Sequence, residues 1–320
     1  MLSNIVIPNS VATICAYAFR DCSVLKEVLF KGNAPWIGTS AFKNVTTIVY
    51  YPVDNDTWTS DVQVQYGGSL TWNSYKEAPT LGTAPIAKAK DFGTCGEVIW
   101  ILTEDDILSI TGIGAMKNYS GRTAIPWYEY KNQIKEVVIN DGVTAIGNYA
   151  FYGMSALEAI HIPDSVTVIG SYAFKGCNAL DNVVLPAKLS VLGESAFYGC
   201  ASLSKIDIPE TVSVVRAYTF KNCCNLSVLT LHEGALVKLE DSAFYGTAIT
   251  ELVIPGCLEV IDSYCFKKCE KLISIIFIEG NLQVIGESAF YGCSAIESIV
   301  LPDNMPEIGE LAFKYVDIAF

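Results

Sequence analysis

Charged residues are scarce in this chain of 320 residues: they make up 17% of it, against 51% hydrophobic residues. The charge that is present is mostly negative, because 34 acidic residues outnumber 21 basic ones and leave a formal net charge of −13. The acids are scattered along the chain, and Lys and Arg form no stripe. Proteins that bind nucleic acids need such a basic stripe to neutralise phosphates, so we expect no nucleic-acid partner.

Long apolar runs are also missing. The longest, Leu272–Ile278, has the length of a strand and falls short of the roughly 18–20 residues that a membrane helix needs. A chain this apolar is not disordered, and without membrane insertion it must bury its side chains in a large, regular core. Residues 1–20 lack the basic and apolar segments of a secretion signal, and we expect the chain to be cut from within a longer repeat array.

Residues suited to catalysis are few. The only histidines, His161 and His232, stand at different positions of the repeat described below. No nucleophile motif, phosphate loop or pair of carboxylates is found. The glycines Gly112 and Gly114 lack the strand–turn–helix context of a dinucleotide site and are typical of a turn. We therefore predict no enzymatic activity, no cofactor and no metal site.

A repeat with a period of 23 residues dominates what is present. Its marker is a phenylalanine, usually preceded by alanine, and Phe151, Phe174 and Phe197 follow one another at 23 residues. Self-similarity at a fixed period is typical of solenoid proteins. The ten markers are Phe19, Phe42, Phe151, Phe174, Phe197, Phe220, Phe244, Phe266, Phe290 and Phe313.

The unit Leu157–Cys177 indicates what one coil does. Ile160 and Ile162 alternate with His161, which is the pattern of a strand with one buried face. Pro163 has no N–H and ends the strand. Further along, a second short segment turns apolar residues inward, and the Ala-Phe pair fills the core on the far side. Because one coil cannot bury its own apolar face, coils must stack, about 4.8 Å apart, into a rod with one parallel sheet.

The unit L-x-x-I-x-I-P-x-x-V-x-x-I-G-x-x-A-F-x-G-C resembles the BspA-like leucine-rich repeats of bacterial surface proteins, and the resemblance covers nearly the whole chain. It implies a β-rich leucine-rich-repeat solenoid: a right-handed superhelix with a parallel sheet, short strands and turns, and little helix. It also implies an extracellular or cell-surface location, with signal and anchor outside this chain. It names no ligand, because members of the family are adhesins and surface proteins with varied partners.

The gap between Phe42 and Phe151 predicts two arrays. Aromatic residues near Trp58 and Trp72 break the repeat, as in the closing cap of such an array, and the Ala-, Pro- and Thr-rich stretch after them indicates a linker. A hairpin-like segment follows and resembles an opening cap, which an array needs to cover its core and strand edge. The predicted parts are residues 1–72 (end and cap of a first array), 73–91 (linker), 92–130 (β-rich opening cap) and 131–320 (a second array of eight coils).

The two chain ends fall close to repeat boundaries and carry no cap. This leads to the hypothesis that molecules associate head to tail, the last coil of one stacking on the first coil of another. The alternative is that the terminal coils fray and the chain stays monomeric.

Eleven cysteines raise the question of disulfides or metal binding. Six of them stand three residues after a marker phenylalanine, where other coils have Val45, Met154 or Thr247. A position that accepts such residues is a buried apolar site, where a free cysteine behaves as a small hydrophobe. Disulfides between coils are disfavoured because stacked side chains point in parallel. The six are Cys22, Cys177, Cys200, Cys223, Cys269 and Cys293.

The residue after the marker alternates between tyrosine and lysine in successive coils of the second array. The true period is therefore a double coil of about 46 residues, twice the single repeat. Neighbouring coils bring a lysine beside a tyrosine and near an acid, which allows cation–π contacts and weak salt bridges. We expect this ridge to stabilise the outer face; the alternative is a tyrosine-rich binding strip. The candidate residues of that strip are Tyr198, Tyr245 and Tyr291.

The exposed face of the strands is the main candidate binding surface, because solenoids usually bind through it. Its side chains lie between the two inward residues of each strand and are largely β-branched, with acidic neighbours such as Glu136 and Glu251. An exposed strip of this kind indicates a protein partner, although β propensity alone would also favour these residues. The candidates are His161, Val184, Asp207, Thr230, Val253 and Ile276.

The predicted function is therefore extracellular binding, by adhesion to or recognition of a host, matrix or cell-surface protein. Two alternatives stay open: a structural spacer in a larger surface protein, and a carbohydrate-binding module. The second is disfavoured because no aromatic platform stands out on the strand face.

Overall fold

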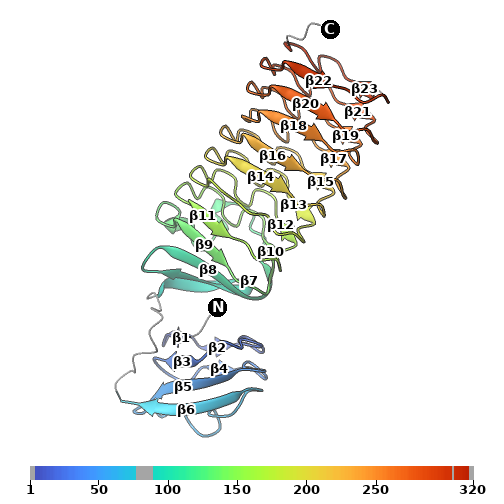
Figure 1. Cartoon of the computed structure of the whole chain (residues 1–320). Helices are drawn as coiled ribbons and strands as arrows, with labels where there is room; N and C mark the ends of the chain where they lie inside the picture. The colour runs from blue at the N-terminus through green and yellow to red at the C-terminus, as the bar shows by residue number, and fades with distance from the viewer. Residues whose placement is uncertain (1–3, 77–88, 305, 317–320) are drawn as a thin grey trace. The chain divides into compact units, whose positions relative to one another are not determined.

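The computed structural model describes residues 4–76, 89–304 and 306–316. The chain divides into two compact units, Met1–Ala89 and Lys90–Phe320, each built from stacked coils with short β-strands (Figure 1). Most of the predicted linker 73–91 lies outside the described residues. Its two ends are strand, because β6 continues to Tyr75 and β7 begins at Ala89.

The first unit contains a four-stranded parallel sheet and a separate pair of shorter strands. Ile5, Val28 and Val49 lie in register on neighbouring strands and are buried, because coils with the same pattern stack with the same side chains inward. The sheet contains, in spatial order, β1 (Asn4–Ile7), β3 (Glu27–Phe30), β5 (Thr46–Pro52) and β6 (Ser69–Tyr75), and the pair is β2 (Thr13–Ile14) and β4 (Trp36–Ile37).

The closing segment of the first unit adds one more strand than its sequence suggests, because β6 pairs in parallel with β5 along its whole length. Between these strands the chain inserts Trp58, which is buried with its ring 4.7 Å from Phe30 and 5.9 Å from Trp72. The Trp58 indole N–H donates to the Gly32 carbonyl at 2.9 Å. Aromatic side chains thus extend the core past the last repeat.

The second unit opens with an antiparallel hairpin of β7 (Ala89–Thr103) and β8 (Ile107–Met116). The first half of β8 pairs in parallel with β9 (Glu136–Ile139), and its second half pairs with β10 (Val143–Ile146). Gly112, with φ of 131°, lies between the two halves, and Gly114, with φ of 123°, begins the second half. Both glycines lie within β8, so the interpretation of this segment as a turn was wrong. Two 3-10 helices, η1 (Arg122–Ala124) and η2 (Tyr128–Tyr130), precede β9.

Two rows of parallel strands continue from β8, whereas the sequence predicted one sheet. The second row was missed because its strands beyond β10 are only two residues long, too short to show an alternating pattern. The first row is β9, β11 (Ala159–His161), β14 (Lys205–Ile208), β16 (Val228–Leu231), β18 (Glu251–Ile254), β20 (Ser274–Phe277) and β22 (Ser298–Val300). The second is β10, β12 (Val168–Ile169), β13 (Val191–Leu192), β15 (Val214–Val215), β17 (Lys238–Leu239), β19 (Val260–Ile261), β21 (Val284–Ile285) and β23 (Glu307–Ile308).

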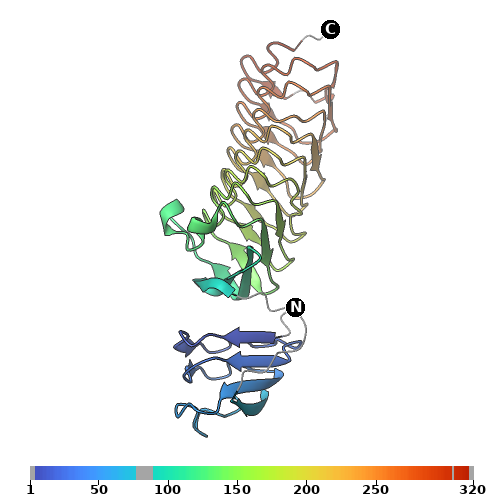
Figure 2. The same ribbon diagram turned by 90° about the vertical axis from the view of Figure 1, so that its left-hand side faces the viewer.

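The first row is interrupted, whereas the second continues from coil to coil. In the third coil of the array, pairing is reduced to isolated bridges from Asn182 to Ala159 and to Lys205. Beyond it the described strands form one ladder of β14 and β16 and another of β18, β20 and β22. The backbone of successive coils still stacks along this row, as Figure 2 shows from the side.

The core of the second unit is a column of stacked phenylalanines. The rings of Phe174 and Phe197 lie 5.0 Å apart and within 10° of parallel, and the Phe266 and Phe290 rings lie 5.2 Å apart. Trp127 begins the column, 5.8 Å from Phe151, and its indole N–H donates to the Ala150 carbonyl. The marker phenylalanine was predicted to fill the core of each coil. This prediction is confirmed, because these rings are fully buried and stack on one another.

Each coil turns twice through left-handed backbone near its marker. The second of these residues, two positions after the phenylalanine, is glycine in five of the eight coils of the second unit, as expected where φ is positive. Asn222, Lys268 and Tyr315 hold the same position with φ of 61°, 61° and 63°. These three coils therefore lack the glycine that the other five coils of the second unit have at this position.

Candidate interaction surfaces

The candidate binding residues that lie in strands occupy equivalent outward positions in three separate ladders of the first row. Asp207 pairs with Thr230, Val253 pairs with Ile276, and Val138 pairs with His161 in register on neighbouring strands. Asp207 and Val253 each lie between two buried side chains, because the strand pattern alternates. The row therefore presents outward side chains of successive coils along one face.

The part of this row nearer the opening cap is polar. His161 and Asp207 are exposed, and Thr230 is partly exposed. The Asp207 carboxylate lies 2.6 Å from the Nε2 atom of His232. His232 stands where other coils have the proline that ends the strand, so its side chain reaches back over the neighbouring coil. The sequence did not reveal this pair, because its partners are 25 residues apart and stand at different positions of the repeat.

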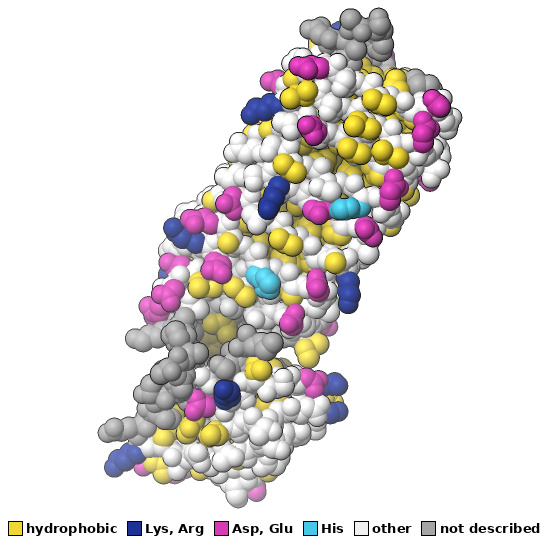
Figure 3. Space-filling view, viewed as in Figure 1, with side chains coloured by type: hydrophobic (Ala, Val, Ile, Leu, Met, Phe, Trp, Pro, Cys, Tyr) yellow, Lys and Arg dark blue, Asp and Glu magenta, His cyan; other side chains and the backbone are white. Residues whose placement is uncertain are grey.

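The part of the row at β18, β20 and β22 is apolar. Val253, Ile276 and Val300 lie side by side in register, and their exposed fractions are 47%, 41% and 55%. Figure 3 shows hydrophobic side chains gathered over these strands with acidic groups around them. Val184, in the polar part, is 72% exposed. Side chains of this size are exposed here although the same strands bury their neighbours.

The tyrosine–lysine ridge is a series of closed clusters. The Lys175 ammonium lies 5.3 Å from the ring centre of Tyr172 in its own coil and 4.2 Å from that of Tyr198 in the next. The same arrangement recurs with Lys221 and with Lys267. The expected cation–π contacts are therefore present. Tyr198, Tyr245 and Tyr291, the candidates for a second binding strip, are partly exposed, and each has a lysine over its ring.

Acidic residues complete these clusters. The Tyr172 hydroxyl donates to Glu194 at 3.0 Å, and the Tyr264 hydroxyl donates to Glu287 at 2.7 Å. These hydrogen bonds, together with burial for Tyr172 and the carboxylate charge for Tyr264, raise the pKa of both phenols above the ordinary value. The ridge satisfies most of its polar groups internally, which supports a stabilising role.

The repeat sequence matches a known family. A sequence model of the BspA type leucine-rich repeat region matches six copies in this chain, over residues 1–60, 124–235 and 193–319. The chain belongs to the BspA-type leucine-rich repeat family. No curated protein is significantly similar to it in sequence.

Solved structures of bacterial leucine-rich repeat proteins resemble this BspA-type chain at low identity. A leucine-rich cell surface protein from Faecalibacterium prausnitzii is 22% identical, with 73% of this chain and 89% of the other covered and a TM-score of 0.40. A leucine-rich repeat protein from T. pallidum is 22% identical, with coverages of 63% and 89% and a TM-score of 0.39. The pneumococcal vaccine antigen PcpA is 16% identical, with coverages of 68% and 72% and a TM-score of 0.37.

The cysteines of this BspA-type array are free thiols. Those at the predicted position are buried, except Cys22, which is partly exposed. The structure adds a role that the sequence did not reveal: each buried thiol donates to the carbonyl of the marker phenylalanine one coil back. Cys200 Sγ lies 3.2 Å from the Phe174 oxygen, and Cys223 Sγ lies 3.1 Å from the Phe197 oxygen. Burial raises the pKa of these two thiols well above the ordinary value.

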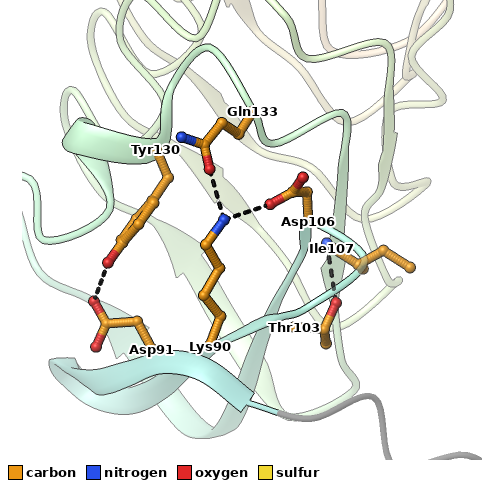
Figure 4. A network of polar contacts seen from close by, with 7 residues as sticks. All are labelled: Lys90, Asp91, Thr103, Asp106, Ile107, Tyr130 and Gln133. Atoms are coloured by element: carbon orange, nitrogen blue, oxygen red, sulfur yellow. Dashed lines mark hydrogen bonds and ion pairs between the residues drawn. The ribbon is translucent and has the colours of Figure 1, made fainter.

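A polar network holds the opening hairpin of the BspA-type array in place (Figure 4). The Lys90 ammonium donates to Asp106 at 2.9 Å and to Gln133 at 2.6 Å. The Tyr130 hydroxyl donates to Asp91 at 3.1 Å, and this bond raises the pKa of Tyr130. These contacts join the start of β7 to the residues around η2. The polar groups of the network are hydrogen-bonded to one another.

The described residues contain neither a cluster of metal ligands nor a helix that could cross a membrane. Among them, no group of three or more His, Cys, Asp or Glu side chains could hold a metal ion. No helix in the described ranges is long and apolar enough to cross a membrane.

Proposed function

We propose that this chain is part of a bacterial cell-surface recognition scaffold, and that the strand face of its second unit binds a protein. The observation that carries the proposal is the exposed apolar cluster of Val253, Ile276 and Val300, which lie side by side in register, with Val184 exposed separately three coils before it. Soluble proteins rarely expose contiguous apolar side chains unless these contact a partner. Family membership supports the scaffold, and the resemblance to surface proteins supports the location.

β propensity alone would place valine and isoleucine in a strand, but it does not account for the whole row. Val184 has the largest exposed fraction of the four and lies in a coil where pairing is reduced to isolated bridges around Asn182. A residue outside a regular ladder gains little from β propensity. Contact with a partner accounts for both parts of the row.

Two variants of the third coil test the proposal. Val184→Glu places a charge on the strand face, and Val191→Glu places the same charge on β13, where Val191 is 38% exposed. Binding of the 320-residue chain to a panel of immobilised matrix and cell-surface proteins is measured by biolayer interferometry. We expect Val184→Glu to weaken binding at least about ten-fold, because a charge buried without a partner disrupts an interface. Val191→Glu should bind like the parent.

Equal affinity of both variants and the parent would show that the strand face is not the binding surface. A parent chain that binds no protein of the panel would favour the spacer function instead.

A further inference from the structure

The first unit ends in a strand that has a partner on one side only. β6 pairs with β5, and among the described residues no strand pairs with its other edge. Figure 1 shows β6 at the end of its sheet. A free edge of this kind presents a row of backbone N–H and carbonyl groups that can pair with a further strand.

The hydrogen bonds of β6 show which residues turn their backbone groups to the free side. The Ser69 N–H donates to the carbonyl just before β5, and the Tyr75 carbonyl accepts from the N–H just after β5, each at 2.8 Å. These two residues therefore face the neighbouring coil. Because the residues of a strand alternate in this respect, Leu70, Trp72 and Ser74 turn their N–H and carbonyl groups to the free side.

The side chain of Gln65 occupies the beginning of this free edge. Its amide oxygen accepts from the Leu70 N–H at 2.5 Å, and its amide nitrogen donates to the Leu70 carbonyl at 3.1 Å. The side chain thus imitates the backbone of a neighbouring strand for one residue. No hydrogen bond within the described ranges reaches the outward backbone groups of Trp72 or Ser74, so two residues of the edge are open to a partner strand.

The edge lacks the features with which proteins usually guard such strands, which are charged side chains, proline and bulges. None of residues 69–75 is charged or a proline, and the pairing with β5 runs without a shift of register. The edge strand of the second unit is different. β7 pairs only with β8, and it contains Lys90, Asp91 and Glu97 and a register shift after Gly96. The second unit therefore guards its edge strand, and the first unit does not.

Charge does not keep two copies of the first unit apart. Met1–Ala89 contains six basic and six acidic residues, so the net charge of this unit is zero, although the whole chain carries −13. A unit without net charge lacks the repulsion that opposes association. A second copy of the chain offers an edge with the same open backbone groups and no charge on its strand.

We propose that β6 pairs with the β6 strand of a second copy of this chain, antiparallel about a two-fold axis. Trp72 of each copy lies opposite Ser74 of the other, and the two residues exchange both backbone hydrogen bonds. Asn73 then lies on the axis, opposite Asn73 of the second copy. The four-stranded sheets of the two copies become one continuous sheet, and the association closes at a dimer. The dimer does not rest on the function proposed above.

Gln65 selects this register. If Trp72 lay opposite its own counterpart, Ser74 of the second copy would lie beside Leu70. That place is held by the Gln65 side chain. In the proposed register the residue opposite Leu70 would be the one after Tyr75, where β6 has ended. All open backbone groups of both edges are then paired, and neither edge displaces Gln65.

Analytical ultracentrifugation of the 320-residue chain tests the proposal, with a thiol reductant present because Cys15 and Cys224 are exposed. We expect a reversible equilibrium between monomer and dimer in the range of about 10 μM to 1 mM, because few hydrogen bonds hold the two edges together. Asn73→Lys places like charges directly opposite each other at the axis and should weaken dimerisation at least about ten-fold. Asn73 is exposed, so the variant keeps the fold.

Thr71→Lys is the matched control, because Thr71 is exposed on the same face of β6 but lies opposite Tyr75 of the second copy. The two introduced lysines are then far enough apart for salt to screen them, and the affinity should stay within about two-fold of the parent. A mixture of Asn73→Lys and Asn73→Asp should form a heterodimer at least about ten-fold tighter than the Asn73→Lys homodimer, because opposite charges then meet at the axis.

A chain that stays monomeric up to about 1 mM, or that assembles beyond a dimer, overturns the proposal. So does an Asn73→Lys variant that dimerises like the parent, or a Thr71→Lys variant that loses as much affinity. Failure of the mixed Asn73 variants to form a heterodimer overturns it as well, because residue 73 would then not lie at the axis.

Discussion

Every coil of the second unit contributes to two ladders, one inside and one outside, and the two obey different rules. Inside, Phe197 stacks on the same residue type in both neighbouring coils, at 5.0 and 5.4 Å. Outside, the next residue, Tyr198, packs against a different type, Lys175, at 4.2 Å. The inner ladder repeats every coil, and the outer ladder repeats every second coil.

The difference shows what each environment demands. The core has the same volume to fill in every coil, so the same ring recurs. On the outside, a lysine in every coil would place like charges near one another, and alternation with tyrosine replaces that repulsion with cation–π attraction. The double period is therefore a property of the surface, and the single period is a property of the core.

The largest expected effect separates the two ladders directly. Phe197→Ala should lower the free energy of unfolding by about 3–5 kcal/mol, because it leaves a cavity in a fully buried column. Tyr198→Ala, one residue on, should cost about 1 kcal/mol or less, since its ring is partly exposed. Chemical denaturation of the two variants measures the contrast, and equal losses would contradict it.

A second prediction concerns pH and the buried thiols. Burial raises the pKa of Cys177, Cys200 and Cys223 in the folded chain. Because the folded chain keeps these thiols protonated, their contribution to the free energy of unfolding is fully present below the thiol pKa of the unfolded chain, about 8.5. It is lost as pH rises from there toward the raised pKa of the thiols in the folded chain. Between pH 8.5 and 10 the free energy of unfolding should fall by about 1.4 kcal/mol per pH unit for each such thiol.

Cys200→Thr isolates one thiol of this set. Thr247 already stands at the equivalent position, and its hydroxyl donates to the carbonyl of Phe244 in its own coil at 3.0 Å, so a threonine hydroxyl has an acceptor at this position. In this variant the free energy of unfolding should fall less steeply with pH, because one thiol no longer contributes to the slope. Urea unfolding at a series of pH values measures the slope, and an unchanged slope would refute the assignment.

The smallest expected effect tests the outer ladder alone. Lys221→Met keeps an unbranched stem between Tyr218 and Tyr245 but removes the cation, 5.0 and 4.4 Å from their ring centres. It should cost about 0.5–1 kcal/mol, the value of an exposed cation–π contact. Lys188→Met, at an exposed lysine of another turn, is the control. A loss as large as that of Phe197→Ala would mean that the ridge is part of the core.

The sequence predicts what repeats and misses what occurs once. The phenylalanine column, the buried cysteine position and the lysine–tyrosine contacts follow from residues that recur at a fixed period. The Asp207–His232 pair does not, because its partners stand at different positions of the repeat. The thiol donors were missed for another reason: spacing locates a side chain in the core but does not identify the carbonyl opposite it.

The second row of strands and the two positions where glycine is replaced were hidden for physical reasons as well. Strands of two residues, such as Val168–Ile169, are too short to show alternation. Asn222 and Lys268 look like ordinary surface variation until their positive φ is known. The usable signal was the glycine that their position has in most other coils.

One strand at the start of the second unit acts as a template for everything after it. Ile110 of β8 pairs with Ile139, and Gly114 of β8 pairs with Val143, so the same four-residue step separates the two rows in the hairpin and in the first coil. Each later strand of the second row then pairs in parallel with the one before it. A residue inserted between Ile110 and Gly114 would therefore break the match between β8 and the two rows of the first coil, and the start of the array would lose the strand that holds both rows.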